Sequence, residues 1–441
     1  MINAIDIIIQ SVLLIAATIL PGITAALNLS PWFYLISGVV FLLINIAPRF
    51  VRRLPMKLEI ERGGVSLLTQ FLITLVPEIL YGILTGAIWF GMFSNMFWLN
   101  ALLIFLSELT VFWNGIIRVY LTSSMLGARW RIAGVLCGMI PIANILVLLH
   151  IMRIAREELK MESRRIEKNR DRIGKNICKT KYPILLVHGV FFRDLDKFNY
   201  WGRIPAELEK NGAKLFYGEQ QSALNVEQSA REVMKKIQEV LEETGSEKVN
   251  IIAHSKGGLD SRYAISHLGA DKYTASLTTV NTPHRGCGFA EWLLNVAPDT
   301  VRENVAGMYN SSFRLLGDSS PDFLGAINDL TTSGCERINR TTPDSDQVYY
   351  QSVGSKINKV MTGVFPLNLS HMLAGVFEGD NDGLVSVESA KWGSKFTFLK
   401  SDSPDGVSHA DVIDLLRHDK PDLDIREFYV QLVSELREKG F

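Results

Sequence analysis

The stretch VNIIAHSKGG, residues 249–258, decides the fold of the C-terminal part of the chain. An apolar run reaches the small residue Ala253, Ser255 and Gly257 follow, and a helical pattern begins near Lys256. This order is typical of a nucleophile elbow, a sharp turn that exposes a serine Oγ above the end of a strand. Larger side chains at positions 253 and 257 would collide with the neighbouring strand and helix. Ser255 is therefore the candidate nucleophile, and the N–H groups that begin the helix favour negative charge beside it.

Short apolar runs alternate with helical patterns from Tyr182 onwards, which predicts a mainly parallel sheet with helices on both faces. Helices are expected over Val226–Glu243 and Gly257–Leu268. The expected strands are Pro183–Val187, Lys214–Tyr217, Lys248–Ile252, Leu277–Val280, Val348–Val353 and Phe396–Leu399. Combined with the elbow, this order predicts an α/β-hydrolase fold over residues 181–441.

The turn after the first expected strand reads His188-Gly189-Val190. In a fold with this elbow, the oxyanion hole takes one backbone N–H from the residue after the nucleophile, which is Lys256 here. A second N–H comes from the loop after an early strand, and Val190 is the candidate.

The acid and the base of a triad should follow the nucleophile in that order. Asp382 lies in the turn GDNDGLV, residues 379–385, where Asp380 is its competitor. His409 lies in a loop after the last expected strand, from which a general base can reach over the sheet. His418, at an expected helix end, is the alternative base.

The first part of the chain is far more apolar than the remainder. A membrane-crossing helix needs about 20 predominantly apolar residues. Four runs meet this length, and they are Ile7–Leu27, Val65–Met92, Met96–Leu121 and Ile132–Met152; Trp32–Ala47 is shorter. We therefore predict an all-α transmembrane helical region over residues 1–152, followed by a basic helical linker over residues 153–180.

The basic residues constrain the topology of this membrane region. A full span over Ile132–Met152 would place the basic stretch Arg153–Lys181 outside, against the positive-inside rule. A break at Gly138–Asn144 would instead make the last segment a re-entrant hairpin. We expect a multi-pass protein of the cell membrane with its catalytic domain on the cytoplasmic face.

Two carboxyl groups, those of Glu78 and Glu108, lie within the expected membrane helices. Such residues usually face the interior of a helical bundle because an exposed charge is costly there. We expect structural hydrogen bonds, involving Asn114 or Gln70, and a functional role is the alternative.

The C-terminal domain resembles a known family, the secreted bacterial true lipases of the Pseudomonas and Burkholderia type, from about residue 182 to residue 409. The matching stretches are Tyr182–Val190, Tyr200–Pro205, Lys248–Arg262, Thr282–Gly286 and Asn381–Val385. The resemblance implies that Ser255, Asp382 and His409 form the catalytic triad. It also implies that Val190 and Lys256 shape the oxyanion hole, which the loop containing Tyr200–Pro205 would support.

The resemblance raises two further points. Lipases of this type hold calcium near the histidine loop, and Asp411 stands at the position of one ligand. Because no aspartate occurs in Ser352–Gly379, where a second ligand is expected, we expect no cofactor and no metal. The resemblance also implies a lid between Phe289 and Leu316, for which a pair of core helices is the alternative.

These observations predict a membrane-anchored serine lipase or esterase that hydrolyses carboxylic esters of lipids through an acyl-enzyme. Its expected partners are an ester substrate and membrane lipids. Because the 46 basic and 46 acidic residues balance, the composition indicates no nucleic-acid partner, and no motif identifies a protein partner. The alternatives are a thioesterase or acyltransferase with the same triad, and a non-catalytic membrane scaffold that has kept the fold.

Overall fold

The computed structural model describes residues 4–441 except for 49–53, 92–93, 139, 141, 191–199, 222, 316–320, 359–378 and 418. The chain divides into two compact units, Met1–Glu167 and Lys168–Phe441. The boundary between them falls inside helix α6, Ala143–Arg172, and within the segment 153–180.

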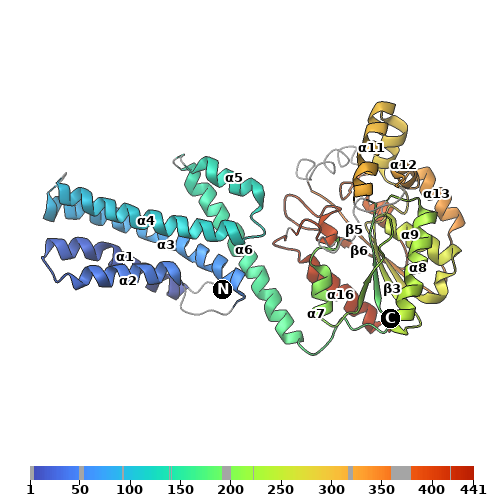
Figure 1. The fold of residues 1–441 in the computed structure, drawn as a ribbon, viewed down its shortest axis with the longest axis horizontal. Coiled ribbons are helices and arrows are strands. Elements are labelled where there is room, and N and C mark those ends of the chain that lie inside the picture. Colours follow the sequence, from blue (N-terminus) through green and yellow to red (C-terminus); the bar gives the residue numbers. More distant parts are fainter. Residues whose placement is uncertain are drawn as a thin grey trace. The chain divides into compact units, whose positions relative to one another are not determined.

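The C-terminal unit is built on one parallel sheet with the strand order β2-β1-β3-β4-β5-β6 (Figure 1). The strands are β1 Ile184–Val187, β2 Leu215–Tyr217, β3 Val249–His254, β4 Thr274–Val280, β5 Tyr349–Ser355 and β6 Lys395–Leu399. All five neighbouring pairs are parallel. The carboxyl ends of the strands therefore lie on one edge of the sheet, and Ser255 follows β3 on that edge.

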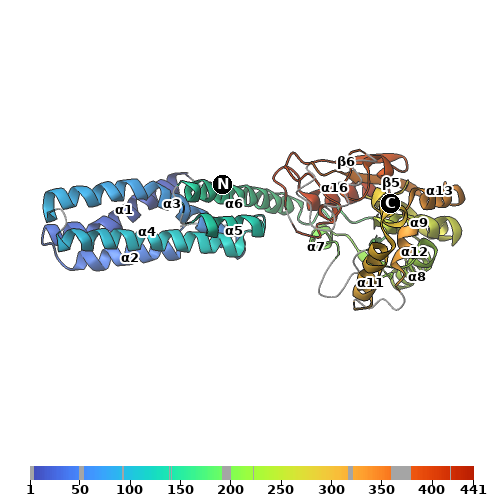
Figure 2. The same cartoon turned by 90° about the horizontal axis from the view of Figure 1, so that it is seen from above.

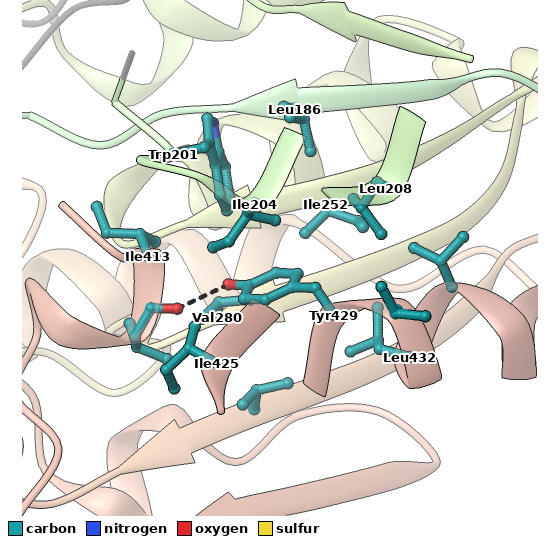
Figure 3. Close-up of a cluster of buried hydrophobic side chains, with 14 of the residues drawn as sticks. Leu186, Trp201, Ile204, Leu208, Ile252, Val280, Ile413, Ile425, Tyr429 and Leu432 are labelled. Carbon is teal, nitrogen blue, oxygen red and sulfur yellow. Dashed lines mark hydrogen bonds between the residues drawn. The ribbon is translucent and has the colours of Figure 1, made fainter. Parts of the chain in front are cut away.

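Helices cover both faces of this sheet. They are α7 Ile204–Lys210, α8 Val226–Thr244, α9 Lys256–His267, α10 Gly288–Glu291, α11 Asp299–Leu315, α12 Phe323–Asn328, α13 Thr332–Thr341, α15 Val387–Ala390 and α16 Ile425–Glu438. Side chains alternate between the faces of a strand. In β1, Leu185 packs with α8 and α9, whereas Leu186 packs with α7 and α16 in the cluster that Figure 3 shows. The predicted α/β-hydrolase fold is confirmed.

The N-terminal unit is helical. Its helices are α1 Ala4–Ala26, α2 Trp32–Ile46, α3 Met56–Thr85, α4 Asn95–Thr122, α5 Gly127–Cys137 and the first part of α6. Helices α1 to α4 run side by side in both views (Figures 1 and 2). Within the described residues, three helical segments are long and apolar enough to cross a membrane, namely Ala4–Ala26, Met56–Phe90 and Asn95–Thr122. Helix α2 is apolar but has only 15 residues.

Of the two alternatives for Ile132–Met152, one continuous helix or a broken segment, the structure has the broken segment. Helix α5 ends at Cys137, and α6 begins only at Ala143. Between them Ile142 adopts φ 68°, a left-handed conformation in which a β-branched residue cannot continue an α-helix. The segment is therefore two helices joined by a break, at the place where the sequence offered a re-entrant hairpin.

The two glutamates of the expected membrane helices, Glu78 and Glu108, are buried, but their hydrogen-bond partners differ from those expected. Glu78 accepts a hydrogen bond from the Thr18 hydroxyl at 2.5 Å, and Glu108 accepts one from Thr74 at 2.5 Å. Gln70 instead bonds to Gln10 on α1, and Asn114 bonds to Asn45 on α2. Each hydroxyl satisfies one carboxyl oxygen, Oε1, because donor and acceptor both face the interior of the same bundle.

Candidate active site

Ser255 occupies a strained turn between β3 and α9. Its backbone lies at φ 54° and ψ −133°, a region that residues other than glycine rarely adopt. The Ser255 N–H donates to the carbonyl oxygen of Val280 at 2.9 Å, which ties the turn to the end of β4. This conformation lifts the serine out of the strand direction, as the elbow pattern predicts.

Two glycines make room for this turn. A Cβ atom at Gly257 would lie 2.4 Å from the carbonyl oxygen of His188, and one at Gly189 would lie 2.7 Å from the Ser255 Cβ. Real Cβ atoms do not approach so closely. Position 257 thus requires a small residue because the turn after β1 lies directly against it.

Asp382 and His409 are 27 residues apart in the chain and form a buried pair, with the histidine Nδ1 2.7 Å from the aspartate Oδ2. The other carboxylate oxygen, Oδ1, accepts the backbone N–H groups of Leu384 and Val385 at 2.9 and 2.8 Å. Since Oδ2 accepts the Nδ1 proton, Nε2 of His409 is left as the basic nitrogen. Gly383, at φ 107°, supplies the left-handed residue that this turn requires.

His409 contacts the elbow at His254, the residue that precedes Ser255. The rings of His254 and His409 lie 4.4 Å apart between centroids. His409 is 6% exposed and Ser255 is 7% exposed, so both lie just beneath the surface. The structure thus brings His409 and Asp382 to the edge of the sheet that carries Ser255.

The two candidate oxyanion residues flank Ser255. Val190 lies one residue beyond Gly189, and its side chain packs into the core formed with helices α10 to α13. Lys256 begins α9, and its buried ammonium group bonds to Asp260 at 2.7 Å and Ser229 at 2.8 Å. Because the Lys256 side chain bonds to these two partners, the backbone N–H of Lys256 is its candidate donor to an oxyanion.

The alternative site residues have other positions. Asp380 is an exposed residue that pairs with Lys356 at 3.0 Å. His418 lies outside the described residues. In the expected lid, Leu293 is part of the buried core whereas Val296 is 68% exposed. The side chains of Phe289 and Phe313, and the whole of Leu316, lie outside the description.

Asp411, the candidate calcium ligand, is paired with a lysine. Its Oδ2 lies 3.1 Å from the Lys420 ammonium nitrogen and also accepts the N–H and hydroxyl of Ser408. Both side chains of the ion pair are below one-tenth exposed. The Lys420 ammonium group thus balances the negative charge of the Asp411 carboxylate.

Sequence reasoning assigned no role to His254 and only a general supporting role to Tyr200. The Tyr200 hydroxyl lies 2.6 Å from Nδ1 of His254 and accepts the N–H of Gly189 at 3.1 Å. Arg203, in the same segment, bonds to Asp414, which follows the histidine loop. The matching stretch Tyr200–Pro205 indicated a role for this segment. It did not indicate the hydrogen-bond partners, because these lie far away in the chain.

A serine held at positive φ between a central parallel strand and a helix defines the class, and the C-terminal unit is an α/β-hydrolase. No model of a known protein family matches the chain. A triacylglycerol lipase from Vibrio cholerae is 31% identical over 236 residues, which cover 48% of this chain and 75% of that lipase. The chain belongs to the triacylglycerol lipase family.

The chain is also similar to a second relative and to a solved structure. A triacylglycerol lipase from Pseudarthrobacter phenanthrenivorans is 35% identical over 180 residues, which cover 38% of this chain and 55% of the relative. The chain thus spans about half the length of that relative. A crystal structure of a Bacillus licheniformis lipase in propeptide form is 21% identical, with a TM-score of 0.46, and covers 57% of this chain and 50% of that one.

Proposed function

We propose that this chain is a membrane-anchored serine lipase or esterase in which Ser255, Asp382 and His409 form the catalytic triad. The observation that carries the proposal is the buried pair of Asp382 and His409 beside the strained serine turn. Membership of the triacylglycerol lipase family supports lipid esters as the substrate class. The proposed units are a transmembrane region over residues 1–152, a basic linker over 153–180 and a catalytic domain over 181–441.

In the proposed mechanism, Nε2 of His409 takes the proton of Ser255 Oγ as this oxygen attacks the ester carbonyl. Asp382 holds the Nδ1–H and stabilises the imidazolium that forms. The backbone N–H groups of Lys256 and Val190 stabilise the oxyanion. His409 then returns the proton to the leaving alcohol, and water attacks the acyl-enzyme by the same route.

An exposed apolar surface on the catalytic unit supports a lipid substrate. Val296, which precedes α11, and Val301 and Met308, which lie within α11, are 68%, 38% and 56% exposed. Neighbouring polar residues such as Arg302 and Asp299 pair with one another at 2.6 Å. A helix with apolar side chains turned to solvent fits a lid that meets an acyl chain or a bilayer.

The anchor is proposed to cross the membrane through α1 to α4. This even number of spans places the loop before α3, the loop after α4 and the basic part of α6 on one side. The break between α5 and α6 removes the need for a fifth span. The positive-inside rule then favours the cytoplasmic face for the catalytic unit. Protease protection of a C-terminal tag in right-side-out and inverted vesicles tests this topology; protection in inverted vesicles contradicts it.

The decisive experiment for the activity uses the full chain in detergent with a fluorophosphonate probe, which reacts with an activated serine. We expect wild type to be labelled at Ser255 and to hydrolyse esters, and S255A to lose both while expressing normally. The loss of one triad member typically costs several orders of magnitude. An unlabelled wild type would support the alternative of a non-catalytic scaffold.

A panel of matched esters and thioesters, with and without an acceptor alcohol, then separates the remaining alternatives. Preferred hydrolysis of lipid esters supports the lipase or esterase. Preference for thioesters, or transfer of the acyl group to the alcohol in place of water, would favour a thioesterase or an acyltransferase with the same triad. The fold alone does not distinguish these reactions.

A further inference from the structure

The hydroxyl group of Tyr200 connects two segments that flank the candidate nucleophile. Tyr200 is 3% exposed, and its Oη lies 2.6 Å from Nδ1 of His254 and 3.1 Å from the backbone nitrogen of Gly189. His254 directly precedes Ser255, and Gly189 directly precedes Val190. One hydroxyl therefore touches the chain on the nucleophile side and on the oxyanion side of the site.

The chemistry of these contacts defines the state of His254. The Gly189 N–H can only donate, so the Tyr200 oxygen accepts there, and the Tyr200 O–H can donate to Nδ1 of His254. In this direction of the bond, Nδ1 is the acceptor and the neutral imidazole carries its proton on Nε2. Burial, together with the nearby His409, lowers the pKa of His254 well below its usual value. His254 is therefore an uncharged ring at neutral pH.

The His254 ring in turn contacts the candidate base. Its centroid lies 4.4 Å from that of His409, with an angle of 49° between the rings. The rings of Tyr200 and Trp201 lie 5.7 and 6.4 Å from His254. The aromatic neighbours hold the His254 ring in place, so that it restricts the position of the His409 ring. Because His254 is uncharged, it does not repel the positive charge that His409 acquires during catalysis.

The other contact of Tyr200 acts on the oxyanion side. A Cβ atom at Gly189 would lie 2.7 Å from Ser255 Cβ and 3.3 Å from Ser255 Oγ. The backbone of Gly189 is thus packed directly against the serine, and any shift of this turn moves Val190 relative to Oγ. Because Tyr200 accepts the Gly189 N–H, its hydroxyl restrains that shift.

We propose that Tyr200 and His254 are positioning residues that hold the general base and the oxyanion turn at fixed places on the two sides of Ser255. The Tyr200 hydroxyl does this by bonding to His254 and Gly189 at once. The inference rests on the proposed function, in which Ser255 is the nucleophile and His409 the base. Neither residue is required to touch the reacting atoms.

The test compares Y200F with Y350F in the full chain. Tyr350 is a matched control because it is also a buried tyrosine, and its hydroxyl likewise accepts a backbone N–H, that of Ser345, at 3.1 Å. It is the second residue of β5 and lies near the amino ends of the parallel strands, whereas Ser255 follows the carboxyl end of β3. We expect Y200F to lower kcat about 10- to 100-fold with KM within about two-fold, since misplacement of catalytic groups by ~1 Å costs about 100-fold. Y350F should leave both constants within about two-fold of wild type.

Two further variants address His254. The side-chain oxygen of asparagine can stand in for Nδ1 as the acceptor of the Tyr200 proton, whereas leucine cannot. H254N should therefore retain more kcat than H254L. The double variant Y200F/H254L should lose little more than the worse single variant, because both single changes break the same contact.

Fluorophosphonate labelling separates this inference from the proposed function. If wild-type Ser255 is not labelled, the proposed function fails. If wild type is labelled but Y200F reacts at the same rate and keeps its kcat, only the positioning role is overturned. Equal losses in Y200F and Y350F, fully additive losses in the double variant, or a change confined to KM would overturn it as well.

Discussion

His409 is held to Asp382 by two hydrogen bonds: its Nδ1 lies 2.7 Å from Oδ2, and its backbone N–H donates to the Asp382 carbonyl oxygen at 2.9 Å. The side-chain bond sets the tautomer of the imidazole, and the backbone bond sets the position of the loop that carries it. A single aspartate therefore governs both the chemistry and the placement of the proposed base.

The first prediction follows from this double contact. D382N should lower kcat by about 10⁴-fold, because an amide favours the wrong tautomer of His409. D380N is the matched control two residues away, since Asp380 pairs only at the surface with Lys356. Steady-state kinetics on a short soluble ester, corrected for the fraction of folded protein, provides the measurement. If D380N is the more damaging change, Asp382 is not the acid of the triad.

A second prediction concerns the glycines around the elbow. G189A should reduce kcat about 100-fold because its Cβ would press on Ser255. G257A should destabilise the fold by roughly 1–3 kcal/mol, since its Cβ would meet the His188 carbonyl oxygen. G307A within α11, where a Cβ would meet nothing within 4 Å, should leave kcat unchanged and should raise stability by about 0.5–1 kcal/mol, the usual gain from alanine in a helix interior. Kinetics and thermal unfolding measure the two effects, and a fully active G189A would contradict the close packing.

A third prediction concerns calcium. Chelation of divalent ions should leave activity nearly unchanged, because Lys420 neutralises Asp411 at 3.1 Å. K420A should lower stability by about 3–5 kcal/mol, the usual result of leaving a buried charge without its partner. K356A removes an exposed pair and should cost less than about 1 kcal/mol. A reversible loss of wild-type activity that only calcium restores would show that oxygens complete a metal site near Asp411.

A fourth prediction concerns acid stability. Burial lowers the pKa of His254 and of His284 well below the usual value, so both are neutral in the folded chain. The unfolded chain binds a proton at each histidine below about pH 6.5. Their stabilising contribution is therefore complete above that pH and is lost as the pH falls, by up to about 1.4 kcal/mol per pH unit for each histidine.

Thermal unfolding of the full chain between pH 7.5 and 5 measures this dependence. H284Q should flatten it, because glutamine can keep a hydrogen bond to Thr279, which His284 Nε2 makes at 2.9 Å, without binding a proton. An unchanged slope in H284Q would show that His284 does not contribute to the acid sensitivity.

A fifth prediction separates anchoring from chemistry. A truncated chain beginning at Lys168 keeps Arg172, which bonds to Glu427 at 2.8 and 2.6 Å within the catalytic unit. It should retain most of its turnover on a short soluble ester and lose activity on long-chain lipid in vesicles. The tether raises the concentration of enzyme at the bilayer, and its removal touches no catalytic group. Equal losses on both substrates, in a folded protein, would show that the membrane helices contribute to the site itself.

Much of this molecule was predictable because its signals are local. All six expected strands form. The inner strands β1 and β3 are buried along their whole length, and strands covered on both faces are rich in apolar residues that stand out in the sequence. The elbow was equally clear, because a serine turn between a strand and a helix needs small residues at fixed spacing. The sequence left two alternatives open over Ile132–Met152, because hydrophobicity measures suitability for a membrane and not helix continuity. In the structure α5 ends at Cys137, and the left-handed residue Ile142 directly precedes α6.

The α/β-hydrolase order, the candidate serine and the apolar character of the N-terminal helices can be read from the amino-acid sequence, because each depends on neighbouring residues. Which polar groups meet depends on the folded molecule. Tyr200 and His254 are 54 positions apart, and Thr18 and Glu78 are 60 apart. Neither spacing corresponds to a helix or strand period, so no sequence pattern indicates these contacts. Such contacts depend on the packing of whole helices and strands, which brings a donor within 3 Å of an acceptor only after the core has formed.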